Sequence, residues 1–304
     1  MSEKTHDLGA KYLVDPYLNW AKAEGVPIVE GAALDLLMLE TRPWARFGVN
    51  GAICHVEGRC DYLSAFLFEL PPGQCSAPMR HLYDDCFYVL EGRGVSEITL
   101  SNGARHDMAW GEGCVFTIPV NASCVLRADG ASRARLVSFN DMRYLMGLYR
   151  NESFLFANPS PMSARQRLAM QSPLCIDLAP LRSSTSLQPG DSAIGADFGC
   201  LAPGVATTAT RQMQGAHMLG LRGEGVTVSL VSENSERVTT HWRRGSLIGL
   251  PGMEFHQHRG GGEANAAFLK VELGSKAAPL FRSRRAAYGD TEVYASGSAV
   301  LATV

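Results

Sequence analysis

The sequence has few charged residues and no long apolar run. Charged side chains make up 19% of the 304 residues, and 28 Lys and Arg against 30 Asp and Glu leave a formal net charge of −2. Without a basic excess, we expect neither a nucleic-acid partner nor a membrane-surface partner. No apolar stretch approaches the roughly 20 residues that a membrane-spanning helix needs. Residues 1–7 are polar, so we expect no secretory signal and a cytoplasmic protein.

Closely spaced cysteines are also missing. The eight cysteines are scattered without a Cys-x-x-Cys pair, so we expect small buried side chains rather than a disulfide framework. Glycine, by contrast, is frequent at 31 residues. Low charge together with many glycines is typical of a turn-rich β protein. A chain of this length can bury one large core or two.

Residues 71–94 carry the first clear pattern. A Pro-Pro turn ends at Gly73, a polar stretch and an apolar stretch follow, and Gly92 begins the next turn. Turn residues on both sides of two short strands predict a β-hairpin with one polar face. A second turn–strand–turn unit runs from Gly113 to Pro119 and beyond.

These four residues recur later in the chain at a nearly constant offset. Gly204 follows Gly73 at the same interval as Gly223 follows Gly92. Gly245 follows Gly113, and Pro251 follows Pro119, at an interval that is a single residue longer. Such a shared offset at four places indicates an internal duplication. The sequence therefore predicts two antiparallel β-barrels.

The repeat divides the chain into five expected segments. They are an N-terminal arm with a short helix (1–30), a first barrel (31–140), a helix and linker (141–188), a second barrel (189–275) and a C-terminal arm (276–304). In the first arm, Asp15, Pro16 and Gly25 match the N-cap, first turn and stop signal of a helix. Such arms often cover the edge of a sheet.

The two units, each repeated, resemble the signature motifs of the cupin superfamily, because the intervals between each glycine and the metal-ligand positions match. More loosely, Asp15-Pro16-Tyr17 and His256-Gln257-His258 resemble segments of gentisate dioxygenase-like bicupins. The resemblance covers residues 55–275. It implies an all-β chain of two tandem jelly-roll barrels with short helical arms. It also implies a ligand pocket inside the barrel mouth, often with Fe, Mn, Ni or Zn.

In the first barrel, the resemblance places Met79, His81, Asp85 and Cys124 at the four metal-ligand positions. A cupin metal site takes two His from one strand, a carboxylate from the next and a third His, because alternate residues of a strand face the same side. Only His81 is retained, and Met79 is a poor ligand for hard divalent ions. We therefore expect no cofactor. If a divalent metal (Fe, Mn or Zn) binds, its ligands would be His81, Asp85 and Cys124.

In the second barrel, the same positions hold Thr210, Gln212, Ala216 and His256. Three of the four lack a metal ligand. However, His256 and His258 alternate along one strand, so both could face inward. For any one of these residues, a hydrogen-bonded place in the core is the plainer alternative.

Three functions stay open. The first is a small-molecule enzyme that uses metal-independent acid–base chemistry, of isomerase, cyclase, dehydratase or epimerase type, with His81, Asp85 and His256 as catalytic residues. Its substrate-binding residues would be Met79, Cys124, Thr210, Gln212 and His258. The alternatives are a metal-dependent, dioxygenase-like enzyme and a non-catalytic bicupin that binds a small ligand.

All three functions give the protein a small-molecule partner, and we expect a homodimer or higher oligomer. The shape of the first barrel should separate catalysis from binding. An open cavity around His81 and Asp85 would favour catalysis there. An interior filled by Met79 and aromatic side chains would favour binding or a structural role.

Overall fold

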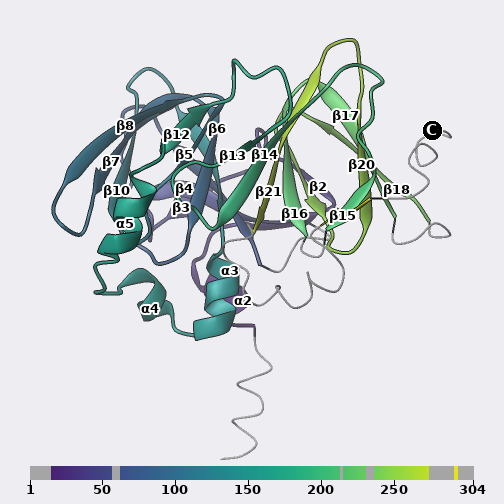
Figure 1. Ribbon diagram of the computed structural model, residues 1–304. Helices are drawn as coiled ribbons and strands as arrows, with labels where there is room; N and C mark the ends of the chain where they lie inside the picture. The colour runs from purple at the N-terminus through teal and green to yellow at the C-terminus, as the bar shows by residue number, and fades with distance from the viewer. Residues whose placement is uncertain (1–14, 57–61, 213–214, 231–235, 274–290, 294–304) are drawn as a thin grey trace, which may run out of the picture.

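The computed structural model describes residues 15–56, 62–212, 215–230, 236–273 and 291–293, and predictions for the other residues, including most of both terminal arms, lie outside it. Four β-sheets form two barrels, which occupy the left and right halves of Figure 1. The predicted all-β architecture of two tandem barrels with short helices is confirmed. None of the helices in the described ranges is long and apolar enough to cross a membrane.

The first barrel consists of a large and a small sheet. The large sheet runs in the order β1 (Ile28–Gly31), β4 (Val49–Val56), β5 (Ser64–Leu70), β11 (Ala134–Asn140), β6 (Asp85–Glu91), β9 (Cys114–Thr117) and β12 (Cys175–Asp177), with β3 (Arg42–Trp44) beside β4. The small sheet runs in the order β10 (Ser123–Ala128), β7 (Arg93–Thr99) and β8 (Arg105–Gly111). All pairs are antiparallel except β1 with β4.

The second barrel repeats this arrangement. Its large sheet runs in the order β13 (Thr185–Leu187), β14 (Ile194–Leu201), β21 (Ala266–Leu273), β16 (Ala216–Arg222), β19 (Ser246–Leu250) and β2 (Ala33–Asp35). The other sheet runs in the order β18 (Val238–Arg243), β17 (Glu224–Leu230), β20 (Phe255–Gly260), β15 (Thr210–Gln212) and β22 (Thr291–Val293). The helices are α2 (Pro16–Ala23), α3 (Met142–Tyr149), α4 (Glu152–Phe156) and α5 (Ser163–Ala169).

The strand registers confirm the duplication. Equivalent cross-strand pairs are Leu70–Ala134 and Leu201–Ala266, Phe87–Phe116 and Met218–Ile248, and Gly94–Trp110 and Gly225–Trp242. The offset between the barrels is constant up to β7 and grows by a single position from β8 onward. The extra position lies between Ser229 and Val238, which are paired like Ile98 and His106 but stand one residue further apart in the sequence. Each position in one barrel therefore has a defined equivalent in the other.

The hairpin predicted over residues 71–94 is wrong in its pairing. Its first segment forms isolated bridges with β10, one of which joins Met79 to Cys124. Its second segment, β6, instead pairs with β9 and β11 in the large sheet. The turn residues were identified correctly, but local turn signals do not determine which strand becomes the neighbour.

The large sheets of the two barrels pack through their outer faces. This apolar layer includes Cys54, Leu67, Val137, Leu219, Leu269 and Val271. Each fully buried aliphatic side chain stabilises such a core by about 1.5–3 kcal/mol. One strand also crosses between the barrels, since β2 lies between β1 and β3 of the first barrel in the chain but pairs with β19 of the second. The predicted segment boundaries stay a prediction.

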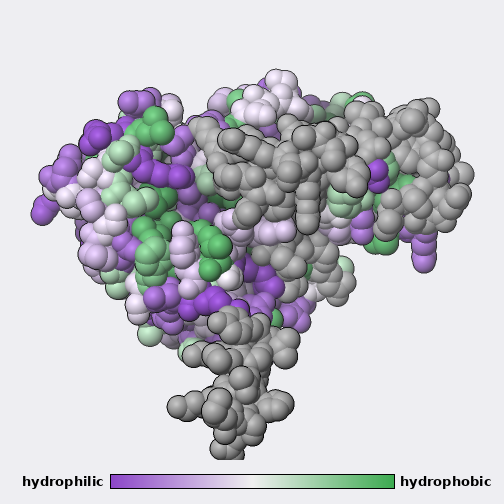
Figure 2. Space-filling view, turned by 60° about the horizontal axis from the view of Figure 1, so that its bottom comes forward, coloured by the Kyte–Doolittle hydropathy of each residue, from purple (hydrophilic) through white to green (hydrophobic). Residues whose placement is uncertain are grey.

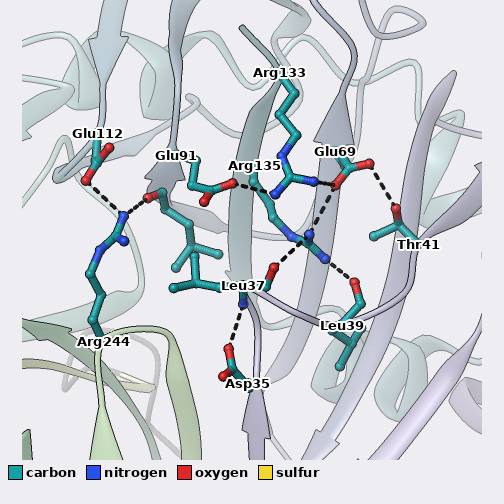
Figure 3. Close-up of polar contacts among 11 residues, drawn as sticks. Asp35, Leu37, Leu39, Thr41, Glu69, Glu91, Glu112, Arg133, Arg135 and Arg244 are labelled. Carbon is teal, nitrogen blue, oxygen red and sulfur yellow. Dashed lines mark hydrogen bonds and ion pairs between the residues drawn. The ribbon is translucent and has the colours of Figure 1, made fainter.

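Buried and half-buried arginines fix the segment that crosses between the barrels (Figure 3). The Arg135 side chain is buried on β11 and donates hydrogen bonds to the carbonyl oxygens of Leu37 and Leu39. Arg244, in the turn before β19, pairs with Glu112 of the first barrel at 2.9 Å. Because buried guanidinium groups need several acceptors, the Arg135 contacts hold the crossing segment in one path, while the Arg244 contact joins the two barrels.

The helices lie below the first barrel in Figure 1. As predicted, Asp15 caps α2 by accepting hydrogen bonds from the backbone N–H groups of Tyr17 and Leu18. Helices α3 to α5 expose four large apolar side chains, Leu148, Tyr149, Phe154 and Leu168. Figure 2, which brings the bottom of the molecule forward, shows hydrophobic residues between hydrophilic ones on this half. The expected self-association stays a prediction.

Candidate functional site

The two barrels differ most in what fills them. The interior of the first contains four phenylalanines, each at most 1% exposed: Phe66, Phe68, Phe87 and Phe116. The equivalent residues of the second are Asp197, Gly199, Met218 and Ile248. None of these four has the volume of a phenylalanine, and Asp197 and Gly199 line an open space, although the Phe268 ring fills the part of it next to Gly199.

A cavity of about 350 Å³ occupies the opened region of the second barrel. Its apolar lining includes Ala216, Leu250, Pro251 and Phe268. Its polar lining consists of Ser184, Asp197, Thr207, Thr208, Thr210, His256, His258 and Lys270. A mostly apolar concave surface with a few convergent polar groups is the usual form of a small-molecule site.

Strand β20 brings His256 and His258 to the inner face of this barrel, as their alternation predicted. Thr210 pairs with His256 across β15 and β20, which is the equivalent of the Met79–Cys124 bridge. The His258 ring packs 4.9 Å from the Phe268 ring. His256 is 8% exposed, and its Nε2 atom has no hydrogen-bond partner among the described residues. A buried polar atom left unpaired in this way costs about 1–3 kcal/mol.

Both imidazoles are neutral at physiological pH. Burial lowers the pKa of His256 to about 4, and the nearby Lys270 ammonium contributes in the same direction. The pKa of His258 falls to about 3, through burial first and then through His256 and Lys270. The Lys270 charge therefore reaches both rings.

Sequence reasoning missed Lys270 and Asp197. The Lys270 ammonium lies 3.3 Å from carboxylate oxygens of both Asp197 and Glu272. A signal was present, because Lys270 and Glu272 alternate along the otherwise apolar strand β21 and so share a face. Alternation alone does not predict that Lys270 faces the inside of the barrel, because charged residues are uncommon there.

The equivalent tryptophans of the two barrels differ in their hydrogen bonds. Trp110 donates from Nε1 to the Ser96 hydroxyl at 3.0 Å. In the second barrel the corresponding hydroxyl belongs to Thr227, which lies 2.9 Å from His258 Nδ1. The Nε1 group of Trp242 has no acceptor in the described ranges. The hydroxyl that holds the tryptophan in one barrel thus holds His258 in the other.

In the first barrel, the structure brings His81 and Asp85 together. Nε2 of His81 lies 3.7 Å from an Asp85 carboxyl oxygen, and the side chains are 7% and 2% exposed. The His81 ring stacks on Tyr83 at 3.6 Å, and its Nδ1 lies 3.0 Å from the Tyr83 carbonyl oxygen. Ser138 donates to the other Asp85 oxygen at 2.5 Å. His81 Nδ1 and one Asp85 oxygen therefore have local hydrogen-bond partners, while His81 Nε2 and the other Asp85 oxygen face each other at 3.7 Å.

Burial makes this first-barrel group neutral. It lowers the pKa of His81 to about 4 and raises that of Asp85 well above the usual carboxyl value. Burial also raises the pKa of the Cys124 thiol to about 12. Met79 and Cys124 lie beside each other as predicted, but within a filled apolar core. A filled interior favours a structural role for the first barrel.

The predicted site residues therefore fall into two separate groups, one in each barrel. The first-barrel group is Met79, His81, Asp85 and Cys124, and the second-barrel group is Thr210, His256 and His258. Gln212 ends β15, and its side chain lies outside the described part of the structure. The catalytic and binding roles given to these residues stay predictions.

The residues present do not fit a Mn, Fe or Zn ion. Within the described ranges, no three His, Cys, Asp or Glu side chains converge on one point. In the first barrel the neutral Asp85 carboxyl is engaged with Ser138, and Cys124 is a soft thiol. In the second, the Lys270 charge opposes a cation beside His256. The expectation of no cofactor itself stays a prediction.

Comparison with known proteins identifies the fold. The chain is similar to a structure of Bacillus subtilis oxalate decarboxylase from work on its Mn(II) centres, at a TM-score of 0.57 and 13% identity, covering 81% of this chain and 78% of that one. A mutant of the same enzyme matches at a TM-score of 0.58 and 12% identity, over 81% and 78% of the two chains. A structure from work on the enzyme's substrate binding mode matches at 0.57 and 13%, over the same shares.

The fold is therefore that of a bicupin, as predicted. The narrower resemblance to gentisate dioxygenase-like bicupins is not supported by these matches. No family model matches the sequence, and no curated protein does. At such low identity, the likeness establishes the fold alone.

Proposed function

We propose that the chain is a small-molecule enzyme whose reaction takes place in the second-barrel cavity, with His256 as the residue that transfers a proton. One observation carries this proposal. The Nε2 atom of His256 is buried in the wall of a cavity and lacks a hydrogen-bond partner among the described residues. A ligand with a polar group at that point would remove the cost of the unpaired atom.

The lowered pKa of His256, about 4, fits acid–base chemistry that needs no net release of a proton. At pH 7 the imidazole is unprotonated, so it can accept a proton, and its low pKa makes it a weak base in doing so. Once protonated, it is a strong acid in this environment and returns the proton readily. Isomerisation and epimerisation require this two-way transfer. The hydroxyl of Thr210, on the facing strand, would orient the substrate.

Two other assignments follow from this proposal. We assign His81 and Asp85 a structural role, because the first barrel is filled and each of the two side chains already has a hydrogen-bond partner. The dioxygenase-like alternative loses support, because neither barrel offers a suitable ligand set within the described residues. A purely binding role remains as an outcome of the experiment.

Deuterium exchange tests the proposal. The protein would be incubated in D₂O with small ketones, hydroxyketones, lactones and 2-oxo acids, and loss of the C–H signal next to the carbonyl followed by ¹H NMR. We expect exchange with at least one class, and a loss of at least 100-fold in His256→Gln. His81→Gln, a matched change in the closed barrel, should keep the wild-type rate. Binding of these compounds without exchange would make the protein a binding protein, and loss in His81→Gln alone would move the site to the first barrel.

A further inference from the structure

The second-barrel cavity also indicates what kind of molecule it takes. We infer that its ligand is uncharged and has an apolar body about the size of one ring, with a hydroxyl or carbonyl group that hydrogen-bonds to His256. This inference rests on the proposed function for the location of the site. It adds the chemical class of the ligand.

The charges around the cavity disfavour an anion. Lys270 is paired with Asp197 and Glu272, each at 3.3 Å, so this group has a formal charge of −1. His256 and His258 are neutral and add no positive charge. A carboxylate entering the cavity would lose its hydration without gaining an uncompensated positive partner. A dianion such as oxalate, on which the similar bicupins act, would be disfavoured further.

A cation is disfavoured close to the histidines, because Lys270, and neither Asp197 nor Glu272, is among the charges that shift the pKa of the two rings. The Lys270 ammonium lowers the pKa of both histidines, so its field reaches the atoms that would contact the ligand. A positively charged group beside His256 would meet the same repulsion. An uncharged hydrogen-bonding group avoids both penalties.

The remaining lining sets the size and the apolar character of the ligand. Leu250, Pro251 and Phe268 form an apolar wall opposite the polar groups. The volume of about 350 Å³ is near the lower end for small-molecule pockets, about 300–1,000 Å³. Hydroxyl groups of Thr207, Thr208 and Thr210 offer neutral hydrogen bonds. One apolar ring with a single polar substituent matches this lining.

Probes that share one ring and differ in charge test the inference. Benzamide and benzyl alcohol are uncharged, benzoate is an anion and benzylamine is a cation at pH 7. Binding would be measured by calorimetry, and its location by the NMR signals of the His256 ring. We expect the two uncharged probes to bind at least ten-fold more tightly than either charged one.

Variants separate the charge argument from other causes. Asp197→Asn removes one negative charge from the Lys270 group and should raise benzoate affinity several-fold without weakening benzamide. Asp107→Asn makes the same charge change at an exposed position of the first barrel and should alter neither. His256→Phe should weaken benzamide about five-fold, the loss of one hydrogen bond.

Several results would overturn the inference. Benzoate binding as tightly as benzamide would refute the charge argument, and failure of all four probes at millimolar concentration would refute the size argument. Binding needs no turnover, so the expected order of affinities without deuterium exchange would reject only the proposed reaction. Exchange that depends on His256 but occurs only with 2-oxo acids, which are anions, would reject only the ligand class.

Discussion

Replacing His81 by Gln tests whether the first barrel holds a neutral polar core. Burial lowers the pKa of His81 from 6.5 to about 4. Between these values the unfolded chain binds a proton that the folded protein does not. Acid therefore favours unfolding, and the stability contributed by the neutral ring is present above pH 6.5 and lost as the pH falls toward 4.

The size of the effect follows from the two pKa values. Because each pKa unit corresponds to about 1.4 kcal/mol, the full difference between the folded and unfolded values is worth about 3 kcal/mol. Only part of it falls between pH 7 and pH 5, where the loss is about 2 kcal/mol. Gln cannot be protonated, so the variant should lose this part of the pH dependence, whatever its stability at pH 7.

Urea denaturation at pH 7 and pH 5 measures the difference. The unfolding free energy should fall less between the two pH values in His81→Gln than in wild type, by the amount that the neutral ring contributes. His106→Gln, on the exposed surface of β8, is the control and should leave the fall unchanged. An identical fall in wild type and His81→Gln would refute the buried, neutral state of this ring.

Burial of Asp85 should change the pH dependence of stability in the opposite direction to burial of His81. Its folded pKa is raised, so the folded protein keeps a proton that the unfolded chain releases above about pH 3.8. Stability contributed by the neutral acid is lost as the pH rises, by about 1.4 kcal/mol for each pH unit up to the folded pKa. Asp85→Asn should therefore remove a fall in stability that begins above about pH 3.8, whereas His81→Gln removes a rise in stability between about pH 4 and pH 6.5.

Two further predictions use equivalent or matched positions. Trp110→Phe should lower the unfolding free energy by about 1 kcal/mol more than Trp242→Phe, because among the described residues only Trp110 has a hydrogen-bond acceptor to lose; equal effects in urea denaturation would contradict this. Gly92 and Gly103 both have positive φ angles, of 82° and 84°. Gly92→Ala should cost much more than the roughly 1 kcal/mol expected for Gly103→Ala, since its methyl group would clash with the Arg133 carbonyl oxygen, whereas Gly103 faces open space; similar melting temperatures would count against it.

The glycine and proline spacing predicted the fold because backbone conformation requires those residues. Gly92 and Gly223 adopt φ angles of 82° and 62°, and Gly113 and Gly245 both adopt 85°. Residues with a side chain rarely tolerate these angles. The recurrence of these glycines therefore indicates that the chain path recurs. The side chains inside the barrels are not restricted by backbone conformation in this way, and they differ between the two repeats.

Sequence could not show which barrel is open. The four phenylalanines that close the first barrel lie on β5, β6 and β9, and their replacements on β14, β16 and β19. No short stretch of sequence shows that phenylalanines were replaced, because each strand contributes only one or two of them. They come together only through the pairing of the strands. The nearly constant offset between the repeats contained the needed correspondence. Applied to interior positions rather than to turns, that offset pairs Phe68 with Gly199.

The contrast between the two interiors is the strongest argument for where function lies. In the first barrel, His81 and Asp85 are neutral, each has one hydrogen-bond partner, and the filled core around them leaves no room for a ligand. In the second, a charged Lys270 group faces a cavity in which one imidazole nitrogen lacks a partner among the described residues. Buried polar groups are usually satisfied, and an exception beside a cavity carries an unfavourable energy that a ligand can remove. A duplicated fold can keep one copy closed while the other remains open, and here a buried apolar layer between the two large sheets joins the closed barrel to the open one.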